Sequence, residues 1–308
     1  MNERTVAKRG ADFDADSFLN ELFQYQKTGS RVFRCYKKDK QLKPTLLRRY
    51  DEFGFDENEH GMIAYEETVL KLFSKYCSND LPSILTPLDF VAYAQHFGVP
   101  TRLIDWSFDP FCSLFFSINR PLEADDTGYY LAMANIETNM YFENIFTGVF
   151  QPMLSQEVTR TNFPLINEYV YFVQKVLSLD FNVASESIKT HQSKLSKDTL
   201  QRLKDYLDDE STSRKHKLFF CTCNDSNTRI IAQSGLFQIP RSFIDASGKD
   251  CIDQNVIEAC ETKYIIDKSV VESLLECLKK LGITKPKLFP DIVSKCQFIF
   301  ESNPFDLL

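Results

Sequence analysis

The stretch from Ala94 to Ser107 limits what this chain can fold into more than any other segment. It places a histidine, an arginine, an aspartate, two hydroxyl groups and the only tryptophan around Gly98 and Pro100. Proline lacks a backbone donor and glycine favours turns, so the pair interrupts any regular element. The apolar run that follows, residues 110–116, predicts a buried helix or strand. Polar groups on a bend beside a buried element are typical of a functional site.

The same turn also allows a purely structural interpretation. Arg102 and Asp105 could satisfy each other, and Trp106 could fill the core. Buried polar groups need partners in any fold, so both interpretations stay open at this point.

The order of predicted elements favours the α+β class, because strands and helices do not alternate strictly as they would in a doubly wound parallel sheet. Residues 1–16 are predicted to be a flexible tail, and residues 37–56 a solvated basic loop. Residues 139–215 are rich in Glu, Lys, Ser and Leu at helical spacing and are predicted to be a helical insertion. Further strands are predicted at residues 31–36, 128–134, 217–223, 229–239 and 264–266, and helices at 17–23, 63–76, 88–97 and 270–281.

Composition and missing motifs exclude several functions. A net charge of -7 argues against a broad polyanion-binding face but not against a local basic groove. The nine cysteines have no metal-like spacing and predict buried thiols in a reducing cytosol. Neither a signal peptide nor a membrane-spanning run is evident, so a cytoplasmic protein without membrane contact is expected. The common nucleotide, zinc and hydrolase motifs are absent, and the four scattered histidines suggest no metal site.

Arg34 lies beside Tyr36 on the predicted strand 31–36. A cation on an inner strand is costly unless it meets an anion. That anion could be an acidic residue elsewhere in the chain, or it could be a ligand. The chemistry therefore rests on three places: this strand, the bend at Ala94–Ser107 (the central turn) and residues 229–233.

Several blocks together resemble the FRG domain, a family named for a Phe-Arg-Gly near its start. The first block is Phe33–Cys35, where cysteine replaces the glycine. The most specific block is residues 94–106, and residues 229–237 and 288–291 complete the resemblance. It covers most of residues 18–298 except the insertion, and it implies an N-terminal part at 17–138 and a C-terminal part at 216–308.

The layout of this family resembles that of ADP-ribosyltransferases, which cleave the nicotinamide bond of NAD. The resemblance implies a split, mostly antiparallel sheet flanked by helices. By analogy, Arg34 holds the NAD phosphate, Thr101 or Ser107 supplies a second-strand hydroxyl, and Tyr36 or Trp106 is a stacking ring. The cofactor-binding residues implied in this way are Arg34, Tyr36, Gln95, His96, Thr101, Arg102, Trp106 and Ser107.

A carboxylate is missing where the transferase pattern expects one. Gln233 falls on the predicted strand where those enzymes carry glutamate. A neutral amide neither stabilises an oxocarbenium-like transition state nor activates a nucleophile as a carboxylate does. Glu66 or Asp105 could supply the charge, with Glu66 preferred. The catalytic candidates are therefore Glu66, Asp105 and Gln233.

The resemblance implies an NAD-dependent ADP-ribosyltransferase of toxin or antiviral-defence type that modifies RNA, DNA or protein. A toxin–antitoxin arrangement would add an antitoxin or regulatory protein as partner, for which the helical insertion is a candidate docking surface. The alternatives are an NAD hydrolase and a non-catalytic nucleotide- or nucleic-acid-binding module that uses Arg34, residues 37–49 and Arg102.

Overall fold

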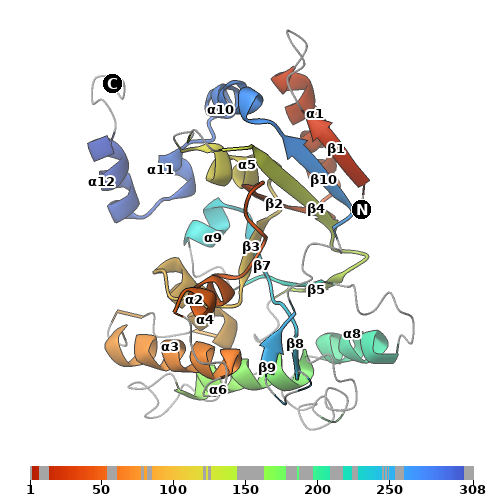
Figure 1. Cartoon of the computed structure of the whole chain (residues 1–308), viewed down its shortest axis with the longest axis vertical. Helices are drawn as coiled ribbons and strands as arrows, with labels where there is room; N and C mark the ends of the chain where they lie inside the picture. Colours follow the sequence, from red (N-terminus) through yellow and green to blue (C-terminus); the bar gives the residue numbers. More distant parts are fainter. Residues whose placement is uncertain are drawn as a thin grey trace.

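The computed structural model has an eight-stranded sheet at its centre, with strand order β1-β10-β4-β2-β3-β7-β6-β5 (Figure 1). All neighbouring strands are antiparallel except the parallel pairs β1–β10 and β5–β6. The α+β class and the mostly antiparallel sheet are therefore confirmed. The structure describes residues 2–6, 14–53, 61–77, 80–81, 85–120, 123, 126–143, 163–177, 186, 197–208, 218–223, 228–244, 246, 248, 250–253 and 260–301.

The strands are short and come from the whole length of the chain. The main sheet contains β1 (Asn2–Val6), β2 (Arg31–Lys37), β3 (Ile104–Ser107), β4 (Tyr129–Asn135), β5 (Met140–Phe142), β6 (Phe219–Cys221), β7 (Gly235–Gln238) and β10 (Thr262–Ile266). A separate hairpin consists of β8 (Ser242–Ile244) and β9 (Asp250–Ile252).

The helices form two groups at opposite ends of the sheet (Figure 1). One group holds α1 (Ala15–Lys27), α5 (Pro110–Ile118) and α10 (Val271–Lys280), and the other holds α3 (Met62–Cys77), α4 (Pro87–His96) and α6 (Phe163–Tyr171). The remaining helical segments are α2 (Thr45–Phe53), the π-helix η4 (Phe172–Val176), α8 (Lys197–Asp208), α9 (Thr228–Ala232), the 3-10 turn η6 (Lys268–Val270), α11 (Lys285–Leu288) and α12 (Ile292–Glu301).

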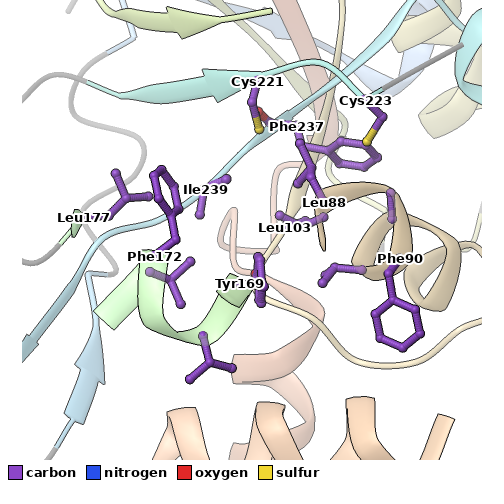
Figure 2. Packing of buried hydrophobic residues seen from close by; sticks show 14 of the residues in the cluster. Leu88, Phe90, Leu103, Tyr169, Phe172, Leu177, Cys221, Cys223, Phe237 and Ile239 are labelled. Atoms are coloured by element: carbon purple, nitrogen blue, oxygen red, sulfur yellow. The ribbon is translucent and has the colours of Figure 1, made fainter. Parts of the chain in front are cut away.

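Each helix group has its own apolar core. Around α3, α4 and α6, side chains from the helices meet those of β6 and β7, as Figure 2 shows for Leu88, Tyr169 and Phe237. Around α1, α5 and α10, the core is built on one face of β2, β4 and β10. A third cluster covers the opposite face of β2 and β4, continues onto β3, β6 and β7, and includes Trp106. None of the described helices is long and apolar enough to cross a bilayer.

The helix that leads into the central turn is confirmed as predicted. Thr86 caps α4 and forms a capping box, in which the Asp89 amide donates to Thr86 Oγ1 at 3.2 Å and Asp89 Oδ2 accepts from the Thr86 amide at 3.0 Å. After His96 the chain bends at Gly98, which has φ +86°. A residue with a Cβ adopts that conformation only at a cost, so glycine suits the end of this helix.

Two secondary-structure predictions between the two ends of the domain were wrong. Residues 37–56, predicted as a loop, contain helix α2, whose buried Leu46, Leu47 and Tyr50 form an apolar face under the basic residues. Residues 229–239, predicted as one strand, begin with α9, and the strand starts only at Gly235 after a bend at Ser234, with φ 47°.

The ends of the domain also differ in detail from the sequence-based boundaries. Within the predicted tail, Asn2–Val6 form strand β1 along β10, a partner more than 250 residues away that no local pattern reveals. Within residues 139–215 the described segments are β5, α6, η4 and α8, so this region contributes an edge strand to the sheet as well as helices. The rest of the predicted insertion lies outside the described residues.

The sheet is divided between β2 and β3. These strands pair at a single position, Phe33 opposite Ser107, whereas β2 pairs with β4 along its whole length from Arg31 to Lys37. The hydrogen-bonded sheet therefore splits immediately after Phe33.

Gly128, at the start of β4, supplies a test of the packing around this sheet. Its φ is +111°, and a Cβ built there would lie 2.2 Å from the Ile266 carbonyl oxygen. Replacing Gly128 with alanine should lower the free energy of unfolding by about 2–4 kcal/mol, measured by urea denaturation, because strain and overpacking act together. Gly29→Ala is the control, since Gly29 has φ +68° with open space around it. Equal losses for both variants would contradict the role of the clash.

Candidate functional site

A cavity of about 290 Å³ lies where the sheet splits. Its walls come from β2, α4, β3, α5, α9 and β7. The polar side chains that line the cavity include those of Arg34, Gln95, His96, Asp105, Arg229 and Gln233. Residues far apart in the sequence therefore meet in one pocket.

Arg34 reaches this pocket because β2 and β3 separate. Nη1 of Arg34 lies 3.6 Å from Oδ2 of Asp105, and the two side chains are 29% and 57% exposed. The Arg34 Nε is buried and has no hydrogen-bond partner among the described residues. A half-exposed ion pair is weak, and a guanidinium has five N–H donors, so Arg34 retains the capacity to bind an anion.

The central turn fixes Asp105 from the other side. Gln95 Nε2 donates to Asp105 Oδ1 at 2.7 Å, and the buried Thr101 hydroxyl donates to Gln95 Oε1. A carboxylate only accepts, so the Gln95 amide must present its nitrogen to Asp105. Thr101 thus acts on the pocket through Gln95 rather than by lining it.

Ser107 anchors the turn that carries Gln233. Its hydroxyl donates to the Gln233 carbonyl at 2.7 Å and accepts from the Asp109 amide at 2.9 Å. The Gln233 side chain lines the pocket and donates through Nε2 to the Leu288 carbonyl at 3.0 Å. Gln233 lies in the turn between α9 and β7 and not on a strand, because the helical turn of α9 intervenes. Its predicted strand position is corrected.

Arg229 and His96 add positive and titratable character. The Arg229 guanidinium lies 4.3 Å from the centre of the Phe289 ring. Burial lowers the pKa of Arg229, and the charges of Asp105 and Asp291 oppose that shift. Burial likewise lowers the pKa of His96, helped by Arg229 and opposed by Asp291. These influences together favour the neutral form of the imidazole. Arg229 lies in the block 229–233 that the sequence singles out, but it was not among the predicted site residues.

Glu66 and Arg102 form a separate, fully buried network. Arg102 Nη2 lies 2.6 Å from Glu66 Oε2, and the Arg102 backbone amide donates to Oε1 at 3.0 Å. Tyr169 donates to the same carboxylate at 3.1 Å, and Arg102 Nη1 donates to Ser242 Oγ at 2.8 Å. Burial and the Glu66 charge raise the pKa of Tyr169 well above its usual value. This network ties α3, the central turn, α6 and β8 together.

The structural alternative for the central turn is therefore correct only in part. Arg102 pairs with Glu66 and not with Asp105, whose partner is Arg34. Trp106 does fill the core: it is 2% exposed, and its Nε1 donates to Gln238 Oε1 at 2.9 Å. Adjacent strand residues point to opposite faces, so Trp106 faces away from Asp105. Tyr36 packs in the same cluster as Trp106, and neither ring lies among the pocket-lining residues.

Burial raises the pKa of Cys35, the residue in place of the signature glycine, to about 12. A buried thiol of that kind is unreactive. Within the described residues, three or more metal-binding side chains do not come together anywhere.

Fold and site together define an α+β domain with a polar, arginine-bearing pocket at a split in its sheet. Residues 29–126 match the family model of the FRG domain, and the chain contains this domain. Searches among curated proteins and among solved structures find no match. The matched segment supplies Arg34, Gln95, His96 and Asp105, whereas Arg229 and Gln233 reach the same pocket from outside it.

Proposed function

We propose that the pocket binds NAD and that the protein is an ADP-ribosyltransferase acting on a cellular macromolecule. One observation carries this proposal: at the split in the sheet, an arginine with unused donors faces an exposed carboxylate inside a cavity of about 290 Å³. Arginine forks suit the phosphate oxygens of a dinucleotide. The ADP-ribosyltransferase-like character of the sheet is part of the proposal and is supported by its division between β2 and β3.

In this proposal Arg34 binds the pyrophosphate, and Arg229, which also lines the pocket, is a second cation. Asp105 is favoured over Glu66 as the essential carboxylate, because Glu66 is fully buried and engaged by Arg102, whereas Asp105 is 57% exposed and lines the cavity. A carboxylate near the ribose stabilises positive charge that develops as the glycosidic bond breaks.

The reaction breaks the bond between ribose C1′ and the nicotinamide nitrogen. The electron pair of that bond leaves with nicotinamide. A nucleophilic atom of the acceptor forms the new bond to C1′. Its proton passes to Asp105, which acts as general base. The class of acceptor, a role as a toxin or in antiviral defence, and a neutralising protein partner remain predictions from the family resemblance.

A second candidate is a nucleotide-binding module without turnover. It is favoured by the two contacts of the Asp105 carboxylate, one with Arg34 and one with Gln95. These contacts satisfy the carboxylate in the absence of substrate. An NAD hydrolase would use the same pocket with water as the acceptor.

The test is incubation of the purified protein with NAD labelled in its adenylate phosphate, together with whole-cell lysate. Label should move onto a macromolecule, and Arg34→Ala should reduce this transfer at least about 10-fold, because a charge-assisted hydrogen bond to phosphate is lost. Arg31→Ala is the matched control, since Arg31 lies on the same strand and its Nε pairs with Glu261 at 3.3 Å, away from the pocket.

The outcomes separate the candidate functions. Labelled ADP-ribose released without transfer would identify a hydrolase. A melting temperature raised by NAD without NAD consumption would identify a binding module, because a ligand that binds the folded state stabilises it. If NAD neither raises the melting temperature nor is consumed, the proposal is refuted.

A further inference from the structure

The split between β2 and β3 is occupied by two serines of helix α5. The Cys35 backbone amide donates to Ser113 Oγ at 2.8 Å, and the Ser117 hydroxyl donates to the Cys35 carbonyl at 2.7 Å. Both backbone groups of one strand residue are thus satisfied by side chains of a helix. Ser113 is buried, and Ser117 lines the pocket.

These two groups point toward the place where β3 would continue. Successive residues of a strand direct their N–H and C=O groups to alternate edges. The even-numbered positions of this segment face β4, since Lys38 donates to Gly128 at 2.9 Å and Ile136 donates to Ser30 at 2.9 Å. Cys35 therefore faces the other edge, where Phe33 pairs with Ser107.

Continuing that register would set Cys35 opposite Asp105. Asp105 pairs with Phe237 of β7 on its far side, but beside β2 the serines take its place. Residues four apart lie on one face of a helix, so a single helix can present both hydroxyls to one strand residue.

Helix α5 is itself anchored to the end of β3. Asp109 caps it by accepting from the Phe111 amide at 2.8 Å, and the Asp109 amide donates to Ser107 at 2.9 Å. The helix therefore cannot shift along β2 without disturbing the only point at which β2 and β3 pair.

We propose that Ser113 and Ser117 are positioning residues that complete the edge of β2 in place of β3 and so hold the pocket open. An unpaired buried N–H or C=O is costly, and the serines remove that cost without closing the sheet. The role of the serines at the split rests on their hydrogen bonds to Cys35. The consequence for NAD rests on the proposed function.

The experiment measures hydrogen exchange at the Cys35 amide by NMR, together with the melting-temperature shift caused by NAD. In Ser113→Ala/Ser117→Ala, exchange at Cys35 should rise at least about 10-fold relative to the amides paired with β4, because the acceptor that protects it is lost. NAD affinity should fall at least about 10-fold, by the loss of the open pocket.

Four further variants make the result decisive. Ser242→Ala is the matched control: this buried hydroxyl also has two partners, Arg102 Nη1 and the Val173 carbonyl, but it lies outside the pocket. It should leave both readouts unchanged. Ser117→Thr keeps the hydroxyl, so its NAD affinity should stay close to that of the wild-type protein. Should the double variant fail to fold, Ser113→Ala alone tests the amide, and Ser117→Ala alone tests NAD affinity.

The failures are distinguishable. Unchanged protection of Cys35 in Ser113→Ala and in the double variant would overturn the role of the serines, whatever the ligand. If the wild-type protein does not respond to NAD, the proposed function fails, and the exchange measurement still decides whether the serines protect the split. Faster exchange with unaltered NAD affinity would overturn the claim that they hold the pocket open.

Discussion

Replacing Glu66 with glutamine is expected to lower the free energy of unfolding by about 3–5 kcal/mol. The substitution leaves the Arg102 guanidinium, fully buried, without its counter-charge. It also weakens the acceptor for the Tyr169 hydroxyl and for the Arg102 backbone amide. Urea denaturation of the two proteins gives the difference directly.

The neighbouring residue provides the control for this measurement. Glu67 lies on the same helix and pairs with Lys71 one turn later, but both side chains are partly exposed. Glu67→Gln should change stability by less than about 1 kcal/mol, as expected for a surface pair. A Glu66→Gln variant with wild-type stability and lost transferase activity would instead assign Glu66 to catalysis and contradict the structural role.

Replacing Asp105 with asparagine is expected to have the largest effect on chemistry. We expect the rate of NAD consumption to fall by about 10²–10⁴-fold, because a general base contributes on that scale. Stability should change little, since the carboxylate is 57% exposed and its pair with Arg34 is weak. Single-turnover kinetics with labelled NAD separate this loss from any change in NAD binding.

A closely matched carboxylate exists elsewhere on the surface. Asp51 is 58% exposed and lies 3.7 Å from Lys43 Nζ, which resembles the environment of Asp105 in exposure and in ion-pair distance. Asp51→Asn should leave the rate unchanged, because Asp51 does not line the cavity. Full activity in Asp105→Asn would show that another group acts as the base.

The fold class and several local elements were predictable from the sequence. The helix from Pro87 to His96 carries its own start signals in Thr86 and Asp89, and Gly98 ends it. Strand β2 was predicted within one residue of its observed bounds. Such signals act over a few residues, so they are present in the sequence regardless of what the rest of the chain does. The block at residues 94–106 and its resemblance to the family could be recognised for the same reason.

The partners of the charged side chains were not predictable. Arg102 could have paired with Asp105 three residues away, but it pairs with Glu66, 36 residues away. Arg34 is the residue that meets Asp105. Local spacing does not decide these pairs, because burying a charge requires a counter-charge in the low-dielectric interior, and packing determines which one arrives there.

The sequence by itself determined the α+β class, the capped helix before the central turn and the residues from which a pocket could be made. Only the tertiary structure decided that Glu66 and Arg102 support the fold, that Trp106 and Tyr36 face away, and that Arg229 joins the pocket. It also decided where the sheet opens, since the groups that replace β3 beside Cys35 come from serines 78 and 82 residues further along the chain. Strand pairing is a non-local interaction, and a backbone edge accepts whichever donors and acceptors the packed fold brings to it.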